Sequence, residues 1–485
     1  MHTCVIWSGF GWLSAAIYQA QAGKKVTIVE KNSQLGGRAR VLEDQWFRQD
    51  MGPSRYLMPD LFESIFADWG IDIHRELDIH KLDPSYRVFR PETDTQQDFY
   101  PRIEANKTFL ESIEPWSYKK FEAFLKEAKV RYDIAIDHLL SIPYEKFTQL
   151  LAPNTIQKVL RVHPFHKLRS EVKTVFKDQR LQQILEYTMV FLGMAPTSSP
   201  AMYSMMAHVD FWLGVRYPQW GIRAVIEVMI TQAKKLGVSF VTGFDVDQIL
   251  IVDWLAAWVV NTTWEIIQAD TVISNADLPY TEMHMLPTQY QTYPTSYRQK
   301  KTLAPSTFLL YLGIKGKISN LEHHSLIFRQ HRDEVFKEIN SWVIPTKPSV
   351  YICCPSHTDT WVAPEWHENL FVLVPTPARV YFDKATEQSF RDQTIALIEE
   401  TIWETFADRI VVEHRYHAEH FEADYHSYKG TALWLGHTLR QSAYRRPHMQ
   451  SQKVSNLYYV WWWTQPGIGM PMCMMSGKLV SEKIG

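Results

Sequence analysis

Glycine is scarce in this chain, and tryptophan is unusually common. The 485 residues include 20 glycines and 18 tryptophans. Glycine therefore makes up about 4% of the chain, whereas it makes up roughly 7% of average proteins. A chain with few glycines has few positions where the backbone can take a positive φ or come very close to a neighbouring group. Nearly equal counts of the smallest and the largest residue are abnormal for a globular protein.

Other absences exclude whole classes of function. The formal net charge is only −2, so no basic surface for nucleic acid is predicted. No window holds the ~18 unbroken apolar residues of a membrane span, and the first three residues lead directly into a predicted strand, so we expect no signal peptide. The four cysteines lack metal or redox spacing, which favours a reducing compartment without disulfides: Cys4, Cys353, Cys354 and Cys473.

Residues 3–40 have the order of a dinucleotide-binding unit. A buried strand at residues 4–7 is followed by a glycine turn, a helix rich in small residues and a β-branched strand at 26–29 that ends in Glu30. In a Rossmann unit the pyrophosphate rests on the helix N-terminus, and an acid about 20 residues after the turn accepts the ribose hydroxyls. Glu30 lies 21 residues after Gly9. Such an acid would repel the 2′-phosphate of NADP.

The glycine fingerprint of this unit is broken. The pattern G-x-G-x-x-G would place glycine at positions 7, 9 and 12, but only Gly9 matches, and the other two positions hold Trp7 and Trp12. The missing glycines permit the tight turn and close helix–strand packing. Taken alone, the motif leaves an ordinary buried βαβ unit as the alternative. Residues 35–39 read Leu-Gly-Gly-Arg-Ala, the usual second phosphate-facing turn of large FAD enzymes, which favours FAD over NAD.

The rest of the chain alternates helical and extended segments. A strand, a Pro-Gly turn and a helix close it, so the cofactor unit is expected to be discontinuous. Apolar periodicity predicts helices at residues 60–69, 118–140, 144–151, 168–192, 226–235, 388–406 and 473–484. It predicts strands at residues 239–241, 245–252, 257–261, 271–274, 306–315, 369–375 and 456–460.

Several specific stretches together resemble one family. Residues 200–206 read Pro-Ala-Met-Tyr-Ser-Met-Met, and residues 464–471 read Thr-Gln-Pro-Gly-Ile-Gly-Met-Pro. With the matching segments elsewhere, the chain resembles the bacterial and archaeal phytoene desaturases, FAD enzymes of carotenoid synthesis, from about residue 3 to residue 484. The other matching segments are residues 50–59, 210–215, 217–221, 274–277, 363–370, 428–433 and 457–460.

The resemblance implies an α/β fold like that of the amine-oxidase-like flavoproteins. A Rossmann-type FAD-binding domain would comprise residues 1–75, 222–285 and 430–485, and an inserted α+β substrate domain would comprise residues 76–221 and 286–429. Val246 would meet the adenine through its backbone, and the turn after Thr464 would approach the flavin. The implied FAD contacts are Gly9, Gly11, Glu30, Gly36, Gly37, Arg38, Val246, Thr464, Gly467, Gly469 and Met470, and the positions of Trp7, Trp12 and Trp461.

The implied reaction is desaturation of a long polyene. A hydride would leave an allylic C–H for the flavin, and a proton would leave the adjacent carbon; no residue declares itself as the base. Since the substrate is apolar and dissolves in membranes, we expect a cytoplasmic enzyme attached peripherally through helices among residues 104–195. Carotenoid isomerisation, desaturation of a C30 dehydrosqualene, amine oxidation and an inactive flavoprotein relative remain open as alternatives.

The same resemblance accounts for the glycine deficit. Glycine suits the family's pattern at eight tryptophan positions, 7, 12, 46, 212, 220, 366, 434 and 461, and it would also suit five more, 254, 258, 264, 462 and 463. Replacing these thirteen would bring glycine to about 7% of the chain. Our hypothesis is that the gene uses UGA for glycine and has been read with a table that gives tryptophan. Random decay of an inactive relative would not choose one replacement eight times. Literal tryptophans would crowd the nucleotide cleft near positions 7, 12 and 461.

Two further clusters suggest metals but are interpreted otherwise. His414, His417 and His420 are three residues apart, yet no cysteine or acid framework surrounds them, so we expect an exposed or half-buried strand face. Four methionines between residues 470 and 475 are expected to lie in the core. No metal site is predicted.

Overall fold

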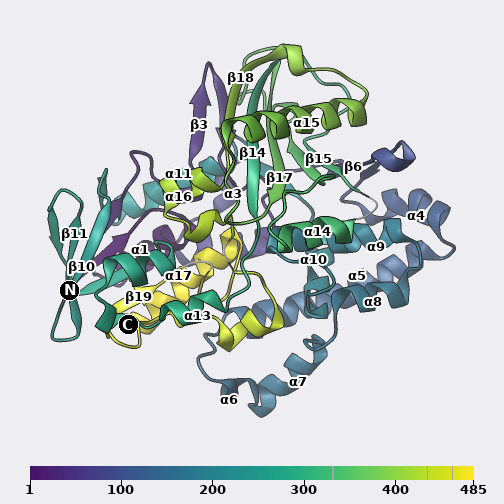
Figure 1. Ribbon diagram of the computed structural model, residues 1–485. Helices are drawn as coiled ribbons and strands as arrows, with labels where there is room; N and C mark the ends of the chain where they lie inside the picture. Colours follow the sequence, from purple (N-terminus) through teal and green to yellow (C-terminus); the bar gives the residue numbers. More distant parts are fainter. Residues whose placement is uncertain (330–331, 434, 461–462) are drawn as a thin grey trace.

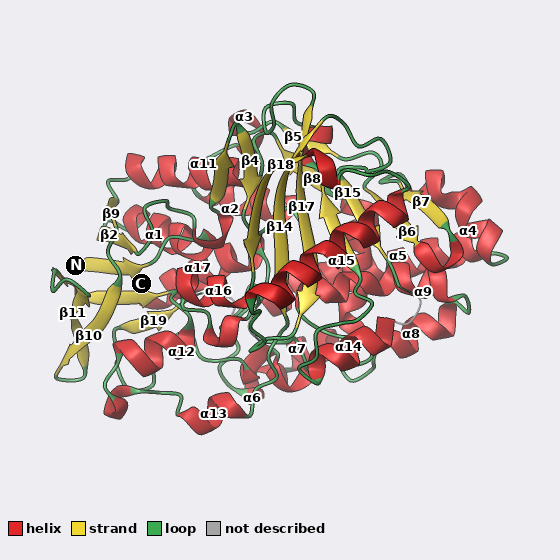
Figure 2. Ribbon diagram, turned by 45° about the horizontal axis from the view of Figure 1, so that its top comes forward, coloured by secondary structure: helices red, strands yellow, loops and turns green. Residues whose placement is uncertain are grey.

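Two large β-sheets with helices packed on them dominate the computed structural model (Figure 1). It describes residues 1–329, 332–433, 435–460 and 463–485. The two termini lie close together at one end of the molecule in both views (Figures 1 and 2).

The first sheet is the predicted nucleotide-binding type, since all neighbouring strands are parallel. Its order is β19 (Leu457–Tyr459), β13 (Thr271–Ser274), β1 (His2–Ile6), β2 (Lys25–Glu30) and β9 (Ser239–Thr242). The strands come from the start, the middle and the end of the chain. The central strands are buried almost throughout, as expected for a parallel sheet covered on both faces.

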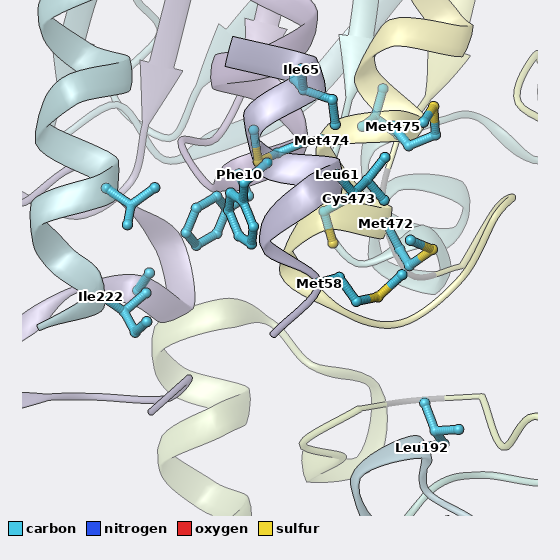
Figure 3. Close-up of a cluster of buried hydrophobic side chains, with 14 of the residues drawn as sticks. Phe10, Met58, Leu61, Ile65, Leu192, Ile222, Met472, Cys473, Met474 and Met475 are labelled. Atoms are coloured by element: carbon cyan, nitrogen blue, oxygen red, sulfur yellow. The ribbon is translucent and has the colours of Figure 1, made fainter. Parts of the chain in front are cut away.

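Helices α1 (Phe10–Gln21) and α17 (Met470–Ile484) pack closely against each other beside this sheet. A Cβ on Gly477 would lie 2.7 Å from the backbone nitrogen of Ala15, so the helices approach where α17 has no side chain. Figure 3 shows the adjoining core, in which Phe10 of α1, Leu61 of α2 (Pro59–Asp68) and Met474 of α17 are drawn together. Met472, Met474 and Met475 are buried and Met470 is half-buried against this core, so the interpretation of the methionines as core residues is confirmed for three of the four.

The second sheet has seven strands. Its order is β18 (Ile410–Tyr416), β14 (Ser306–Lys315), β17 (His367–Thr376), β16 (Val350–Cys353), β15 (His324–Ile327), β6 (Tyr86–Arg90) and β7 (Thr95–Phe99). Side chains alternate along β14: Phe308 and Leu310 join the core under α15 (Lys384–Ile402), while Leu309 and Tyr311 join the core on the other face. Figure 2 shows α15 running across the first of these faces.

Smaller sheets and hairpins complete the β structure. They are β3 (Val41–Asp44) with β4 (Phe47–Asp50), β5 (Ile79–Lys81) with β8 (Arg216–Pro218), and the antiparallel set β10 (Val246–Val252), β11 (Leu255–Asn261) and β12 (Ile266–Gln268).

The remaining helices lie mainly between residues 73 and 235. In chain order they are α3 (Ile73–Glu76), α4 (Lys107–Ile113), α5 (Ser117–Ile134), α6 (Phe147–Leu150), α7 (Pro153–Arg161), α8 (Leu168–Val175), α9 (Gln179–Glu186), α10 (Met205–His208), α11 (Ile222–Lys235), α12 (Leu278–Tyr280), α13 (Thr295–Gln299), α14 (Arg332–Asn340) and α16 (Ala418–Tyr425). None of the helices in the described ranges combines the length and the apolarity needed to cross a bilayer.

Most predicted elements are present, with three corrections. The helix predicted over 168–192 is divided into α8, α9 and a final 3-10 segment, because Asp178 caps a new helix start at α9. Strands β15 and β16 are observed where no strand was predicted. The interpretation of the three histidines as one strand face is wrong: His414 lies in β18, but His417 and His420 form a reciprocal cap at the start of α16.

Candidate cofactor and substrate site

The two predicted glycine turns touch each other. Gly9 lies just before α1, and its carbonyl oxygen accepts hydrogen bonds from the next turn of that helix. A Cβ on Gly37 would be 3.3 Å from the Cα of Gly9, so the contact depends on a missing side chain. The Gly36 N–H donates to Ser8 Oγ at 2.9 Å, which ties the second turn to the first. The fold therefore brings residues 7–11 and 35–38 to the carboxyl edge of β1 and β2.

Glu30 is buried at the end of β2, where a Rossmann unit places the acid that meets the ribose. Its Oε2 accepts hydrogen bonds from the Ser8 N–H at 2.7 Å and from Ser8 Oγ at 2.6 Å, and its Oε1 accepts one from the Asn32 N–H at 2.9 Å. Burial raises the pKa of Glu30, and these donors oppose that rise. The carboxylate is thus fixed in orientation beside the first glycine turn.

The start of β10 lies against the same edge. The Phe244 N–H donates to the carbonyl oxygen of Glu30 at 2.9 Å, which places Val246, fully buried, two residues further on. Asp245 faces His426 Nε2 at 3.3 Å. Val246 therefore lies near Glu30.

Arg38 connects the second glycine turn to the loop after α16. Its guanidinium lies over the ring of Tyr425 at 5.2 Å and donates to Ser427 Oγ. Burial lowers the pKa of Arg38. Asp277 is also buried, and desolvation raises the pKa of its carboxyl to about 8, against the opposing charge of Arg38. A Cβ on Gly52 would lie 2.5 Å from the Arg38 carbonyl oxygen, so the segment after β4 also presses against this turn.

The C-terminal turn meets the same region from the other side. A Cβ on Gly11 would lie 2.7 Å from Val460 and 3.2 Å from the Cys473 carbonyl oxygen. Thr464 is fully buried. Gly467 (φ 145°) packs on His437, and Gly469 (φ 124°) directly precedes Met470, the first residue of α17. Trp461 lies outside the described residues.

Two tryptophans in this region do not fit a dinucleotide. Trp7 has a φ of 79°, is 5% exposed and stacks on His426 with ring centroids 5.7 Å apart. Trp12 is completely buried in α1. The Nε1 of each indole is buried and has no hydrogen-bond partner among the residues that the structure describes. An unpaired buried donor is costly. The glycines and Glu30 thus fit FAD, whereas the indole of Trp7 stands at the turn that should cradle it and the indole of Trp12 lies in the core beside the start of α1.

An apolar cavity lies on the face of the seven-stranded sheet opposite α15. Leu326 and Leu373 of the sheet and Val335 and Ile339 of α14 are among the residues that line it. Sequence reasoning did not identify these residues, because ordinary apolar positions in strands and helices carry no functional signal of their own.

Two tyrosines that line the cavity form hydrogen bonds with residues near the second glycine turn. Tyr351 lines the cavity, and its hydroxyl lies 2.6 Å from Ser54 Oγ. Tyr187 also lines it, and its hydroxyl accepts a hydrogen bond from Arg55 Nη1 at 2.9 Å. Ser54 and Arg55 follow Gly52, which contacts Arg38. These two residues belong to the stretch 50–59 that carried the resemblance, and that was the signal available for them.

A cluster of buried histidine and cysteine side chains lies in the seven-stranded sheet. The pairing of β15 with β16 places His324 opposite Cys353, and with His323 they form a group whose ligand atoms could hold a metal ion. His323 Nδ1 is 2.8 Å from Thr358 Oγ1, and His324 Nδ1 is 2.9 Å from the Tyr351 hydroxyl. Burial lowers the pKa of His323 to about 3, so it is neutral. The spacing of the cysteines in the sequence could not show this neighbour relation. The absence of a metal site stays a prediction.

Comparison with known proteins agrees with this geometry. A model of flavin-containing amine oxidoreductases matches residues 13–485, so the fold and the two glycine turns define a flavoprotein of that class. Among solved structures, an oxidoreductase from Methanosarcina mazei has the same fold, with a TM-score of 0.64 and 16% identity, covering 99% of this chain and 100% of that one.

Two curated relatives extend over the whole chain. A carotenoid 3,4-desaturase from Haloarcula japonica is 38% identical and covers 99% of this chain and 97% of its own length. A zeta-carotene-forming phytoene desaturase from Myxococcus xanthus is 31% identical and covers 99% and 93%. The chain therefore belongs to the flavin-containing amine oxidoreductases, in the branch of the carotenoid and phytoene desaturases. It is an FAD-dependent oxidoreductase, and the resemblance and the fold class predicted from the sequence are confirmed.

Proposed function

We propose that the protein desaturates a long apolar polyene of the carotenoid type, removing hydrogen from two neighbouring carbons. The observation that carries the proposal is the apolar cavity, which connects through Tyr351 and Ser54 to the segment against Arg38. A polyene offers no polar handle, so its site must be a long apolar surface that ends beside the cofactor. The names of the two desaturase relatives support the same substrate class.

The chain's own residues would divide the work between holding FAD and excluding water. The N-terminus of α1 and the turn at Gly36 and Gly37 would face the pyrophosphate, and Glu30 would accept the ribose hydroxyls. FAD supplies the hydride acceptor when it is bound. The aliphatic walls of the cavity would keep water from the reacting carbons. The full set of proposed contacts is Gly9, Gly11, Glu30, Gly36, Gly37, Arg38, Val246, Thr464, Gly467, Gly469 and Met470, and positions 7, 12 and 461.

The proposal assigns the chain to two domains. Residues 1–75, 222–285 and 430–485 would form the FAD-binding domain, and residues 76–221 and 286–429 the substrate domain. All five strands of the parallel sheet fall within the first set of segments, and all seven strands of the second sheet fall within the other.

The substrate domain would attach to a membrane surface through residues 142–165. Six apolar side chains in this stretch are 37–74% exposed: Ile142, Phe147, Leu151, Ile156, Leu160 and Phe165. Helices α6 and α7, which carry three of them, project from the lower edge of the molecule in Figure 1. Lys158 and Arg161 in the same stretch would attract anionic lipids. Such a patch would let the enzyme take an apolar substrate directly from the bilayer.

Co-sedimentation with vesicles tests the membrane contact. Vesicles of phosphatidylcholine with and without phosphatidylglycerol should bind the protein, and the double variant Phe147→Ser, Phe165→Ser should bind far less. Val411→Ser provides the matched control, because Val411 is 44% exposed on β18, outside this patch. Equal binding of all three proteins would contradict the assignment of the patch.

Pigment formation tests the reaction. The gene, expressed in cells that accumulate phytoene and separately in cells that accumulate dehydrosqualene, should produce products with longer conjugated chains, detected by absorbance and mass. A product of unchanged mass would indicate isomerisation instead. No product from either polyene, together with peroxide release on adding amines, would favour amine oxidation and overturn the proposal.

A further inference from the structure

We infer that the natural protein has glycine at nine positions where the printed sequence has tryptophan. The backbone carries this inference independently of any family pattern. Among the residues that the structure describes, eighteen non-glycine residues have a positive φ, and nine of them are tryptophans: Trp7, Trp46, Trp116, Trp220, Trp254, Trp264, Trp342, Trp366 and Trp403. Tryptophan is only 18 of the 485 residues. A bulky side chain is strongly disfavoured in this region, which glycine enters freely.

Two of the nine lie in tight hairpins. Gln45 and Trp46 join β3 to β4 with φ values of 47° and 69°, and Asp253 and Trp254 join β10 to β11 with φ values of 48° and 63°. A two-residue hairpin turn with both φ values positive strongly prefers Asn-Gly or Asp-Gly. Trp46 is 90% exposed and Trp254 is 55% exposed. Neither indole gains enough burial to explain why it stands in such a turn.

A third hairpin gives the same result by different geometry. Between β11 and β12 the Asn261 N–H donates to the Glu265 carbonyl oxygen, and the Trp264 N–H donates to the Asn261 carbonyl oxygen, both at 3.1 Å. Trp264 has a φ of 67°. A residue with positive φ at the end of such a short loop is typically glycine. Trp264 is also 75% exposed.

Helix ends supply cases that the resemblance did not indicate. Trp403 follows α15 with a φ of 53°, and Trp342 follows α14 with a φ of 63°. After α14, the Val343 N–H donates back to the Glu338 carbonyl oxygen at 2.9 Å, as in the helix-ending motif that places glycine in the left-handed position. Trp403 Nε1 donates a hydrogen bond to Asp94 Oδ1 at 3.1 Å, and a glycine at position 403 would lose that bond. Position 403 therefore tests the glycine assignment most severely. Trp116, with a φ of 63°, precedes α5.

Trp69 shows that the inference does not extend to every tryptophan. It ends α2 with a φ of −89°, is 3% exposed and packs on Phe66 at 4.9 Å and Tyr18 at 5.8 Å between ring centroids. The next residue, Gly70, already supplies the left-handed position with a φ of 76°. Position 69 therefore holds a true tryptophan. Tryptophan in the printed sequence therefore represents two different residues, glycine at the nine positions and tryptophan at position 69. Two different codons must then have been translated as the same amino acid.

The consequence for the site concerns position 7. With glycine there, no side chain would stand between β1 and His426, and the buried indole N–H without a partner would be gone. At position 7, the disagreement between the indole and a dinucleotide is thus removed by the same change that the backbone requires.

The codons and the natural protein test the inference directly. We expect UGA at the nine positions and UGG at position 69. Peptides of the protein purified from its own source should have the mass of glycine at positions 116, 342 and 403 and of tryptophan at 69. UGG codons, or tryptophan masses, at 116, 342 and 403 would overturn the inference. This readout does not depend on FAD or on any substrate, so it is separate from the proposed function.

A recombinant comparison provides a second measurement. The chain with all nine Trp→Gly substitutions should unfold at a higher temperature than the printed chain, and adding Trp69→Gly to it should lower that temperature. A nine-glycine chain of equal or lower thermal stability would count against the assignment. A chain with glycine at these nine positions and also at positions 12 and 461 that gains stability but takes up no FAD, measured by flavin absorbance, would uphold the glycine assignment and overturn the proposed cofactor site.

Discussion

Replacing Trp46 with glycine should stabilise the protein, although it removes the largest side chain that a residue can carry. Trp46 has a φ of 69° in a two-residue hairpin turn. Holding an L-residue in the left-handed region costs roughly 1–2 kcal/mol. Glycine loses about 0.5–1 kcal/mol through its greater freedom in the unfolded chain. Trp46 is 90% exposed, so almost no hydrophobic burial is lost. The net gain expected for Trp46→Gly is therefore about 0.5–1 kcal/mol.

Two comparison variants separate backbone strain from the loss of the side chain. Trp46→Ala removes the indole but keeps the Cβ, so the strain remains and no gain is expected. Trp69→Gly removes a tryptophan that is 3% exposed from a relaxed backbone, and should cost about 3–5 kcal/mol. The opposite signs of the two glycine substitutions follow from φ and burial alone.

Urea unfolding followed by circular dichroism measures these differences through the midpoint at constant slope. Fluorescence is less suitable, because each substitution removes an emitting indole. The reasoning would be refuted if Trp46→Ala stabilised the protein as much as Trp46→Gly, since side-chain removal and not backbone conformation would then be the cause. A destabilising Trp46→Gly would refute it as well.

Three further outcomes are expected. Gly477→Ala should lower the free energy of unfolding by about 1–3 kcal/mol and reduce FAD retention, because the new Cβ would push α17 away from α1. Glu482→Ala, at an exposed position of α17, is the control, and equal stability and FAD retention of the two variants would contradict the packing argument. Burial lowers the pKa of His323 to about 3, below its ordinary value of 6.5, so between these values the unfolded chain binds more protons than the folded one. The free energy of unfolding should therefore fall below about pH 6.5, by up to ~1.4 kcal/mol per pH unit. His323→Asn should flatten this pH dependence in urea titrations, and an unchanged slope would exclude His323 as its source. Ile339→Trp should narrow the apolar cavity and lower polyene turnover at unchanged flavin content, whereas the exposed Lys337→Ala should not; full activity of Ile339→Trp would place the substrate elsewhere.

The opening β–α–β unit could be predicted because its information is local. A buried strand, a glycine turn and an acid at the end of the next strand lie within 40 residues, and each restricts the backbone directly. The structure places Glu30 against Ser8 and Gly37 against Gly9, as that order requires. The C-terminal helix was predicted from Cys473, but it starts at Met470, because a proline in its first turn is compatible with a helix start.

The substrate side could not be predicted in the same way, because its contacts are remote in sequence. Tyr351 reaches Ser54 across 297 positions of the chain, and Arg55 reaches Tyr187 across 132. Strands β15 and β16 have four residues each, too few for a periodic pattern to be recognised. The pairing of His324 with Cys353 depends on the register of these two strands, which only the assembled sheet determines.

The tryptophans show both what the sequence alone could predict and what required the structure. The resemblance detected positions where family members have glycine, such as Trp7 and Trp46, but it could not detect Trp342, where only the backbone after α14 reveals the requirement. Trp12 shows the limit of the backbone criterion: it lies inside α1, where φ gives no indication, and neither its burial nor its unpaired indole N–H distinguishes it from Trp69. Glycine can be needed for a left-handed backbone or for a close approach, and only the first of these needs is read directly from φ. Trp7 has a φ of 79° and stands at the turn on which the proposed FAD site depends, so the backbone criterion applies at the position where the site needs it most.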